Sequence, residues 1–108
     1  RQALQPEEEY ILNLEEFLVN LQSDGRSKSY LKIEVAIMYQ DKKEIKHVET
    51  SKSKIRDIVL NNLRTKTSDQ MLDVEETDKL KEAMRTDINN VLKKDIIKEI
   101  YYTNLIIQ

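Results

Sequence analysis

The sequence has 108 residues, no cysteine and one histidine, and its 18 Lys and Arg nearly balance its 20 Asp and Glu, for a formal net charge of −2. This length suits one domain, and 39% hydrophobic with 35% charged residues is typical of a globular chain rather than a disordered one. The lack of cysteine excludes disulfides, thiolate zinc sites and a cysteine nucleophile, and the balanced charge argues against a dedicated nucleic-acid-binding protein.

The first 22 residues divide into a polar segment and a strand pattern. Residues 1–9, RQALQPEEE, hold the only proline and an acidic run, and we expect a solvated linker here in preference to an acidic docking site. Phe17, Val19 and Leu21 then alternate with outward positions, which indicates a strand over residues 10–22. The pair Glu15–Glu16 interrupts the apolar pattern and indicates a bend or bulge.

The clearest strand pattern follows a polar loop whose Asp24–Gly25 pair is a hairpin turn signal. Residues 30–40 place only apolar side chains on one face, which should meet the core. The opposite face begins polar and becomes apolar at Ala36 and Met38. The expected inward residues are Leu31, Ile33, Val35, Ile37 and Tyr39.

A helical period begins after this strand. Ile45 and Val48, three residues apart in the polar stretch 41–50, allow a short helix. A longer helix is predicted from Ser53, with Ser51 or Ser53 as its N-cap. Its predicted stripe consists of Ile55, Ile58, Val59, Asn62 and Leu63.

A second long helix is predicted from Val74. Asp73 and Glu76 have the spacing of a capping box, and Lys93 and Lys94 would interact favourably with the helix dipole in the last turn. The predicted apolar stripe consists of Leu80, Ala83, Met84, Ile88, Val91 and Leu92.

The chain closes on a strand pattern over residues 96–108, which ends with IYYTNLIIQ. Two strands, two long helices and a final strand predict an α+β fold, in which about three strands form a small sheet and the helices pack on one face. The last strand should return to the sheet that the first two begin. A crossover through helices allows parallel or antiparallel pairing, and both stay open here.

Catalytic patterns are missing from this sequence. His47 lies beside Lys46 in a charged stretch and has no second histidine with which to build a metal site. One glycine excludes glycine-rich phosphate loops, and no serine lies in a nucleophile motif. We therefore expect no enzyme activity, no cofactor and no metal, and an interaction or structural domain instead.

The final strand is apolar on both of its alternating faces. One face can pack on the helices, and the other is left over together with the second face of residues 30–40. An uncovered apolar patch marks a partner or self-association surface. The alternative is that the segment 41–50 covers this face. The candidate surface consists of Met38, Ile100, Tyr102 and Ile106.

Five stretches in this order resemble the FliL family of flagellar basal-body-associated proteins. They are FLVNL (17–21), YLK (30–32), IRDIVLNNL (55–63), LKEAMRTDINNVL (80–92) and the closing IYYTNLIIQ (100–108). Tyr102, Asn104 and Thr77 depart from the family's usual Phe, Asp and nearby Gly. The motif positions, expected to be mainly structural, are Phe17, Val19, Asn20, Leu21, Tyr30, Leu31, Ile55, Arg56, Asp57, Leu80, Ile88, Asn89, Leu92, Tyr101, Thr103 and Gln108.

The resemblance implies an organisation and a function. Residues 10–108 would be one periplasmic domain, similar to the SPFH domain of stomatin-like proteins, and residues 1–9 a linker after an N-terminal inner-membrane helix. Such proteins associate with ion-driven stator units of the MotA/MotB type, form homo-oligomeric rings, and support torque, motility, chemotaxis and swarming under load. The alternative is a membrane-tethered stomatin-like scaffold, or a signalling or ligand-binding module, that is not tied to the stator. No nucleic-acid partner is expected.

Overall fold

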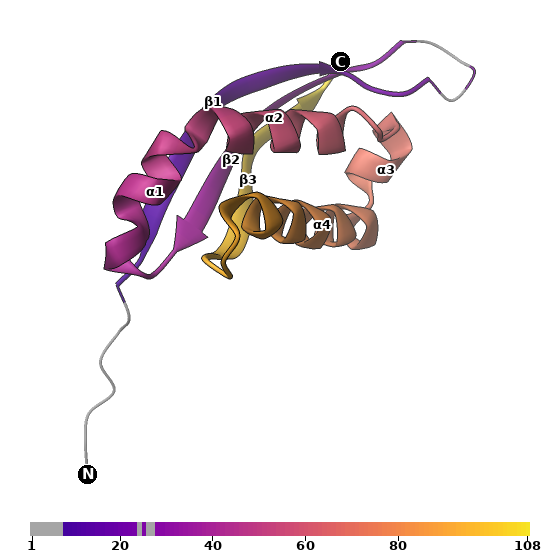
Figure 1. Ribbon diagram of the computed structural model, residues 1–108. Helices are drawn as coiled ribbons and strands as arrows, with labels where there is room; N and C mark the ends of the chain where they lie inside the picture. Colours follow the sequence, from indigo (N-terminus) through magenta and orange to yellow (C-terminus); the bar gives the residue numbers. More distant parts are fainter. Residues whose placement is uncertain (1–7, 24, 26–27) are drawn as a thin grey trace.

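The computed structural model describes residues 8–23, 25 and 28–108, and it places a three-stranded sheet against a layer of helices (Figure 1). Strands lie at both ends of the described chain and helices between them, which confirms the predicted α+β fold. The elements are β1 (Tyr10–Asn20), β2 (Tyr30–Tyr39), the 3₁₀ turn η1 (Lys42–Glu44), α1 (Ile45–Thr50), α2 (Lys52–Leu63), α3 (Ser68–Leu72), α4 (Val74–Leu92) and β3 (Ile97–Ile107).

The sheet has the strand order β1-β2-β3, and both pairings are antiparallel. The final strand therefore returns to β2, which is central, and β1 and β3 are the edges. Asp24 of the predicted hairpin turn lies outside the described residues. Gly25 adopts a φ of +92°, a backbone conformation that suits glycine.

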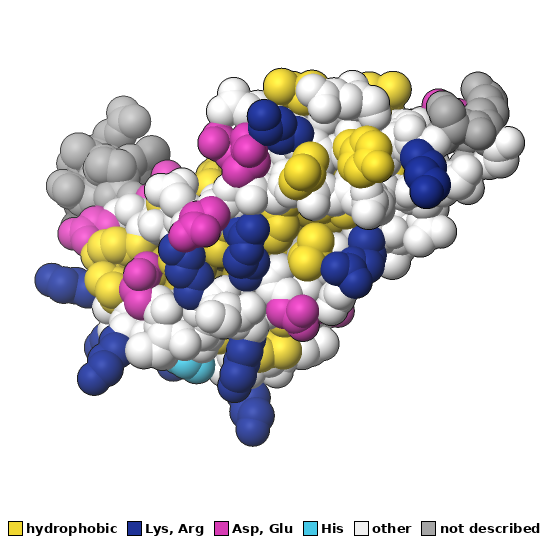
Figure 2. All heavy atoms as spheres, turned by 90° about the horizontal axis from the view of Figure 1, so that it is seen from above, with side chains coloured by type: hydrophobic (Ala, Val, Ile, Leu, Met, Phe, Trp, Pro, Cys, Tyr) yellow, Lys and Arg dark blue, Asp and Glu magenta, His cyan; other side chains and the backbone are white. Residues whose placement is uncertain are grey.

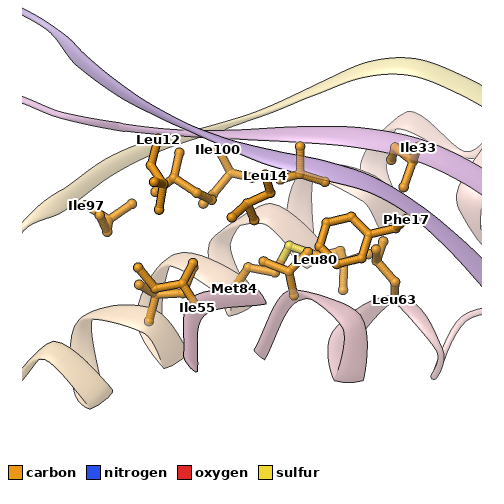
Figure 3. Close-up of a cluster of buried hydrophobic side chains, with 14 of the residues drawn as sticks. Leu12, Leu14, Phe17, Ile33, Ile55, Leu63, Leu80, Met84, Ile97 and Ile100 are labelled. Atoms are coloured by element: carbon orange, nitrogen blue, oxygen red, sulfur yellow. The ribbon is translucent and has the colours of Figure 1, made fainter. Parts of the chain in front are cut away.

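One face of the sheet is covered by α1, α2 and α4, and the core lies between the two layers (Figures 1 and 3). All five predicted inward residues of β2, from Leu31 to Tyr39, are buried. Burying one large apolar side chain stabilises the fold by roughly 1.5–3 kcal/mol, so this layer supplies most of the favourable free energy. The helices contribute Val48, Ile55, Val59, Leu63, Met71, Leu80, Met84, Ile88 and Leu92.

The predicted stripe of α4 is wrong at Ala83 and Val91, which are exposed. The buried residues of α4 recur only every four positions, because the helix meets the core along a narrow line beside α2 and β3. Lys93 is the C-cap, with a φ of +61°, so Lys93 and Lys94 follow the last turn rather than occupy it.

Of the predicted helix caps, Asp73 is confirmed as a capping side chain and Ser51 is not. α2 begins directly after Ser51, but the Ser51 side chain makes no capping hydrogen bond, since the backbone continues almost without a break from α1. The short helix α3 was not predicted, although Thr67 and Gln70 form a complete capping box at its start. Asp73 caps α4 by accepting from the backbone N–H of Glu75 at 3.0 Å.

A bulge interrupts β1 at Glu15 and Glu16, as the sequence predicts. Between Leu14 and Phe17, β1 has one residue more than the strand paired with it. Arg56 of α2 donates to the backbone oxygens of Glu15 (2.6 Å) and Glu16 (3.0 Å), and its guanidinium carbon lies 4.0 Å from the centre of the Phe17 ring. Arg56 therefore satisfies the bulge carbonyls and ties α2 to this edge of the sheet.

Candidate interaction surface

The sheet face turned away from the helices is the candidate interaction surface. Residues paired across an antiparallel sheet point to the same side, so the register defines this face. It consists of the β2 residues Tyr30, Lys32, Glu34, Ala36 and Met38, together with the residues beside them on β1 and β3. We call it the open face.

Exposed hydrophobic side chains gather on the open face. Eight large hydrophobic side chains are exposed among the described residues, and five of them lie here, with exposed fractions from 39% to 69%. Seen from above the view of Figure 1, the molecule shows hydrophobic side chains among both basic and acidic ones (Figure 2). Such a concentration on one uncovered face is typical of a surface that meets a partner. The five residues are Ile11, Leu18, Tyr30, Tyr101 and Ile106.

Three carboxylates form a band across the middle of the open face, between β1 and β3, and we call this band the waist. Its members are Glu15, Glu16 and Glu34. Glu15 and Glu16 of the β1 bulge lie opposite Glu34, and both are exposed. The Glu34 carboxylate accepts from Nδ2 of Asn104 at 2.6 Å and from the hydroxyl of Thr103 at 3.4 Å. These bonds hold the Glu34 carboxylate in place. Lys32 lies beside this band, and Glu99 lies at the β3 edge of the sheet, where it lines a hollow with Lys98 and Arg85.

The structure divides the four predicted surface residues between two faces. Met38 and Ile106 lie on the open face, whereas Ile100 and Tyr102 point toward the helices. Ile100 is 3% exposed and lies in the core opposite Ile37, so its assignment to a free surface is wrong (Figure 3). Met38 is on the open face but only 5% exposed, because the central strand places it between Ile11 and Glu99.

Tyr102 is half-buried against α4. Its hydroxyl lies 3.9 Å from the sulfur of Met84, and the ammonium group of Lys81 lies 4.8 Å from the centre of its ring. Burial raises the pKa of the Tyr102 hydroxyl far above its ordinary value. Tyr102 is therefore a packing residue of the helix side and not an accessible contact residue of the open face.

Two irregularities in β3 explain this division. Strict alternation puts all even-numbered residues of the strand on one face, but β3 carries an extra residue near Lys98 and another near Asn104. Asn104 has a φ of +51°, which a bulge can require and asparagine tolerates. Each extra residue reverses the alternation. The inward residues are consequently Ile97, Ile100, Tyr102, Leu105 and Ile107.

The segment 41–50 does not cover the open face. Val48 of α1 is fully buried in the core on the helix side, and Ile45 packs against the same core. Figure 1 shows α1 continuing into α2 on that side of the sheet. The alternative in which this segment shields the second face of the sheet is therefore wrong.

The family-motif positions have several different surroundings. Eight are core residues: Phe17, Val19, Leu21, Leu31, Ile55, Leu80, Ile88 and Leu92. Four lie on the open face: Asn20, Tyr30, Tyr101 and Thr103. Gln108 exchanges two backbone hydrogen bonds of 2.9 Å with Tyr30, and Asp57 accepts from Asn61 at 3.3 Å. Arg56 holds the β1 bulge.

Asn89 connects α4 to the start of β3. Its Oδ1 accepts from the backbone N–H groups of Ile96 (3.1 Å) and Ile97 (2.8 Å), and its Nδ2 donates to the carbonyl of Ile97 and to Asp95 Oδ1, both at 3.1 Å. From the sequence alone, Asn89 is identified only as a family-motif position, without its hydrogen-bond partners. Its place after the buried Ile88, at the end of a helix, is consistent with a capping role toward the next segment.

A second polar cluster was not predicted. Glu44 is 8% exposed, and its carboxylate lies 2.8 Å from Nζ of Lys94 and 3.0 Å from Nδ1 of His47. The hydrogen bonds from Lys94 and His47 hold the pKa of Glu44 below its ordinary value. The cluster ties η1 and α1 to the end of α4. Fifty residues separate Glu44 from Lys94, so no local pattern could reveal the pair.

Other features of the described surface give weaker candidates. A hollow of about 630 Å³ beside Tyr10 has three acidic and three basic residues among its nine lining residues, so its charges balance. The described residues include no group of three or more His, Asp or Glu arranged to hold a metal ion. None of the described helices is long and apolar enough to cross a membrane. The open face is the stronger candidate.

The family comparison agrees with the motif order. The family described as flagellar basal body-associated protein FliL matches residues 11–108. This chain belongs to the FliL family. A relative, flagellar protein FliL of Aquifex aeolicus (strain VF5), is 26% identical over 92 residues, which are 85% of this chain and 56% of that protein. The chain therefore spans little more than half the length of this FliL relative.

Two departures from the usual FliL pattern have clear local structures. The amide of Asn104 donates to Glu34, a bond that the carboxylate of an aspartate could not make without first taking up a proton. Thr77 lies in the first turn of α4, where its hydroxyl donates to the carbonyl of Val74 at 3.0 Å and its backbone N–H bonds to Asp73. The start of this helix is therefore regular with threonine at this position.

Proposed function

We propose that this FliL-family chain is a non-catalytic periplasmic domain, formed by residues 10–108 and joined through residues 1–9 to an N-terminal helix in the inner membrane. Anchored copies assemble into a ring beside or around the ion-driven stator units and support torque, motility and swarming under load. Family membership supports a place at the flagellar basal body. The gathering of exposed hydrophobic side chains on the open face is the observation that carries the partner-binding role.

Membrane anchoring makes weak contacts sufficient. An anchor confines the copies to two dimensions and raises their effective concentration, so the isolated domain should associate only feebly. A closed ring needs two different patches on each copy, since a head-to-tail contact joins unlike surfaces. Of the four candidate positions predicted from the sequence, only Ile106 combines exposure with a place on the open face.

The test uses the full-length protein in motile cells that lack their own copy. Ile106→Asp and Leu18→Asp place a charge on the open face. Leu72→Asp is the control, because Leu72 is as exposed as Leu18 but lies in α3. We expect the first two variants to lose co-localisation with the stator and motility in viscous medium. Leu72→Asp should behave like the wild type.

Folding must be checked separately. Exposed substitutions usually change the free energy of unfolding by no more than about 0.5 kcal/mol, so all three purified domains should melt close to the wild type. The proposal fails if folded Ile106→Asp and Leu18→Asp proteins are recruited to the stator and support full motility.

A further inference from the structure

The order of apolar and charged side chains along the open face indicates which kind of partner segment can bind there. One apolar group surrounds Met38 and includes Ile11 and Tyr101, and a second group includes Leu18 and Ile106 beside Lys32. Met38 lies six positions after Lys32 in β2, a distance of about 20 Å at roughly 3.3 Å per residue. A segment that fills both groups must therefore be amphipathic and must cross the carboxylate waist between them.

The negative charge of the waist favours a partner segment with positive charge. The middle of the open face carries the three carboxylates of the waist with Lys32 beside them, although the whole chain is nearly neutral. Arg56 holds the two carbonyls of the β1 bulge, a geometry in which Glu15 and Glu16 both face outward. Asn104 and Thr103 hold the third carboxylate, that of Glu34. Acceptors fixed before binding lose little conformational freedom when a cationic side chain arrives.

We infer that the open face binds a basic amphipathic segment of a partner protein, with Lys or Arg side chains of that segment on Glu34 and its neighbours and apolar side chains on the two flanking groups. The inference rests on the proposed function only in taking the open face as the partner surface. Anionic partners, such as nucleic acids and acidic lipid surfaces, are disfavoured because the three carboxylates of the waist repel them.

The inference is tested with two synthetic peptides of 18 residues that share one amphipathic pattern, the first built from Leu and Lys and the second from Leu and Glu. Each is titrated into the ¹⁵N-labelled domain while amide chemical shifts are recorded. The Lys peptide should shift amides of Glu34, Tyr101 and Ile106 and leave the outer surface of α4 unchanged. The Glu peptide should bind at least about tenfold more weakly, since like charges meet at the waist.

Three variants separate charge from shape. Glu34→Gln keeps an acceptor for Asn104 but removes the charge, and it should weaken the Lys peptide about threefold, the order expected for one exposed ion pair. Glu34→Lys should weaken it more than about tenfold. Glu75→Gln is the matched control, because that side chain is 81% exposed but lies on α4, and it should bind like the wild type.

Several outcomes would overturn the inference: equal affinity for the two peptides, unchanged affinity of both Glu34 variants, or shifts centred on the helices. Shifts on the open face that depend on domain concentration without peptide would identify a second copy as the occupant instead.

The recruitment test of the proposed function is independent of the peptide titration, so the two can fail separately. If Leu18→Asp abolishes stator recruitment but the Lys peptide does not bind, the proposed function survives and this inference fails. If the peptide binds as expected but recruitment is intact, the reverse holds.

Discussion

Replacing Asn89 by alanine should destabilise the domain more than any other single change to an exposed or half-buried polar side chain. Asn89 accepts from two backbone N–H groups and donates to one backbone carbonyl at the junction of α4 and β3. The substitution removes all three partners at once. All three groups belong to Ile96 and Ile97, which are buried, so water cannot readily replace the lost bonds. The N–H of Ile96 also donates to the backbone carbonyl of Lys94 at 2.9 Å, so the loss falls mainly on the N–H and the carbonyl of Ile97.

The expected magnitude follows from the groups left unpaired. An unsatisfied buried donor or acceptor costs about 1–3 kcal/mol, so the two groups of Ile97, with some access of water, together cost about 2–4 kcal/mol. Alanine is the better helix former by roughly 0.5 kcal/mol, which offsets a small part. The net loss is about 1.5–3.5 kcal/mol, a substantial fraction of the roughly 5–15 kcal/mol that stabilise a typical domain.

Urea unfolding followed by circular dichroism measures this loss. The midpoint should fall while the slope with urea stays constant, because the change alters stability and not the surface exposed on unfolding. Asn90→Ala is the control, since Asn90 is exposed and precedes the same helix end. It should be neutral or slightly stabilising. The reasoning is refuted if the two variants unfold within about 0.5 kcal/mol of each other, the usual range for surface changes.

Three further changes test other parts of the structure. Arg56→Met keeps much of the apolar stem but leaves the bulge carbonyls of β1 without their donor, and we expect a loss of about 1–2 kcal/mol in urea unfolding. Deleting residues 104–108 removes two half-buried aliphatic side chains and two backbone hydrogen bonds to Tyr30, which should cost about 3–5 kcal/mol and lower the melting temperature sharply. Glu44→Gln should flatten the dependence of stability on acid pH. The folded pKa of Glu44 lies below its ordinary value of 4.5, so its charged form adds stability above about pH 4.5 that is lost as the pH falls through the folded pKa.

Each of these three predictions can be contradicted by a specific measurement. Arg56→Lys should recover only part of the stability, because one ammonium group cannot bridge two carbonyls as a guanidinium does; full recovery would contradict the bridging role. A truncated chain that melts like the intact one would show that the end of β3 adds nothing to the core. For Glu44, wild type and variant should approach each other in stability as the pH falls below about 4.5, and parallel curves across the acid range would contradict the assignment.

Local periodicity was enough to predict most of the fold. The inward face of β2 and the stripe of α2 are repeated patterns that nothing interrupts, so burial follows them. The bulge in β1 was also predictable, because Glu15 and Glu16 break an apolar run. α3 was missed because it has only five residues, too few for a period, although its capping box is visible at Thr67 and Gln70.

Long-range polar contacts were beyond a reading of the sequence. The bond between Glu44 and Lys94 joins residues fifty apart, and the bonds from Arg56 to the β1 bulge span forty. Both depend on how the helices sit on the sheet, and neither residue is marked by its neighbours in the chain. The same holds for Glu34, whose partner Asn104 lies seventy residues away.

The irregular end of β3 links the fold to the proposed partner surface. The extra residue near Asn104 reverses the alternation of β3, which sends Ile106 outward and Leu105 and Ile107 toward the core. The same asparagine donates to Glu34 and so fixes a carboxylate at the centre of the open face. One residue in a left-handed conformation thus decides which hydrophobic side chains the sheet exposes and where its negative charge is held. The composition of β3 alone, apolar on both faces, indicates that a surface exists, and only the bulge determines which residues form it.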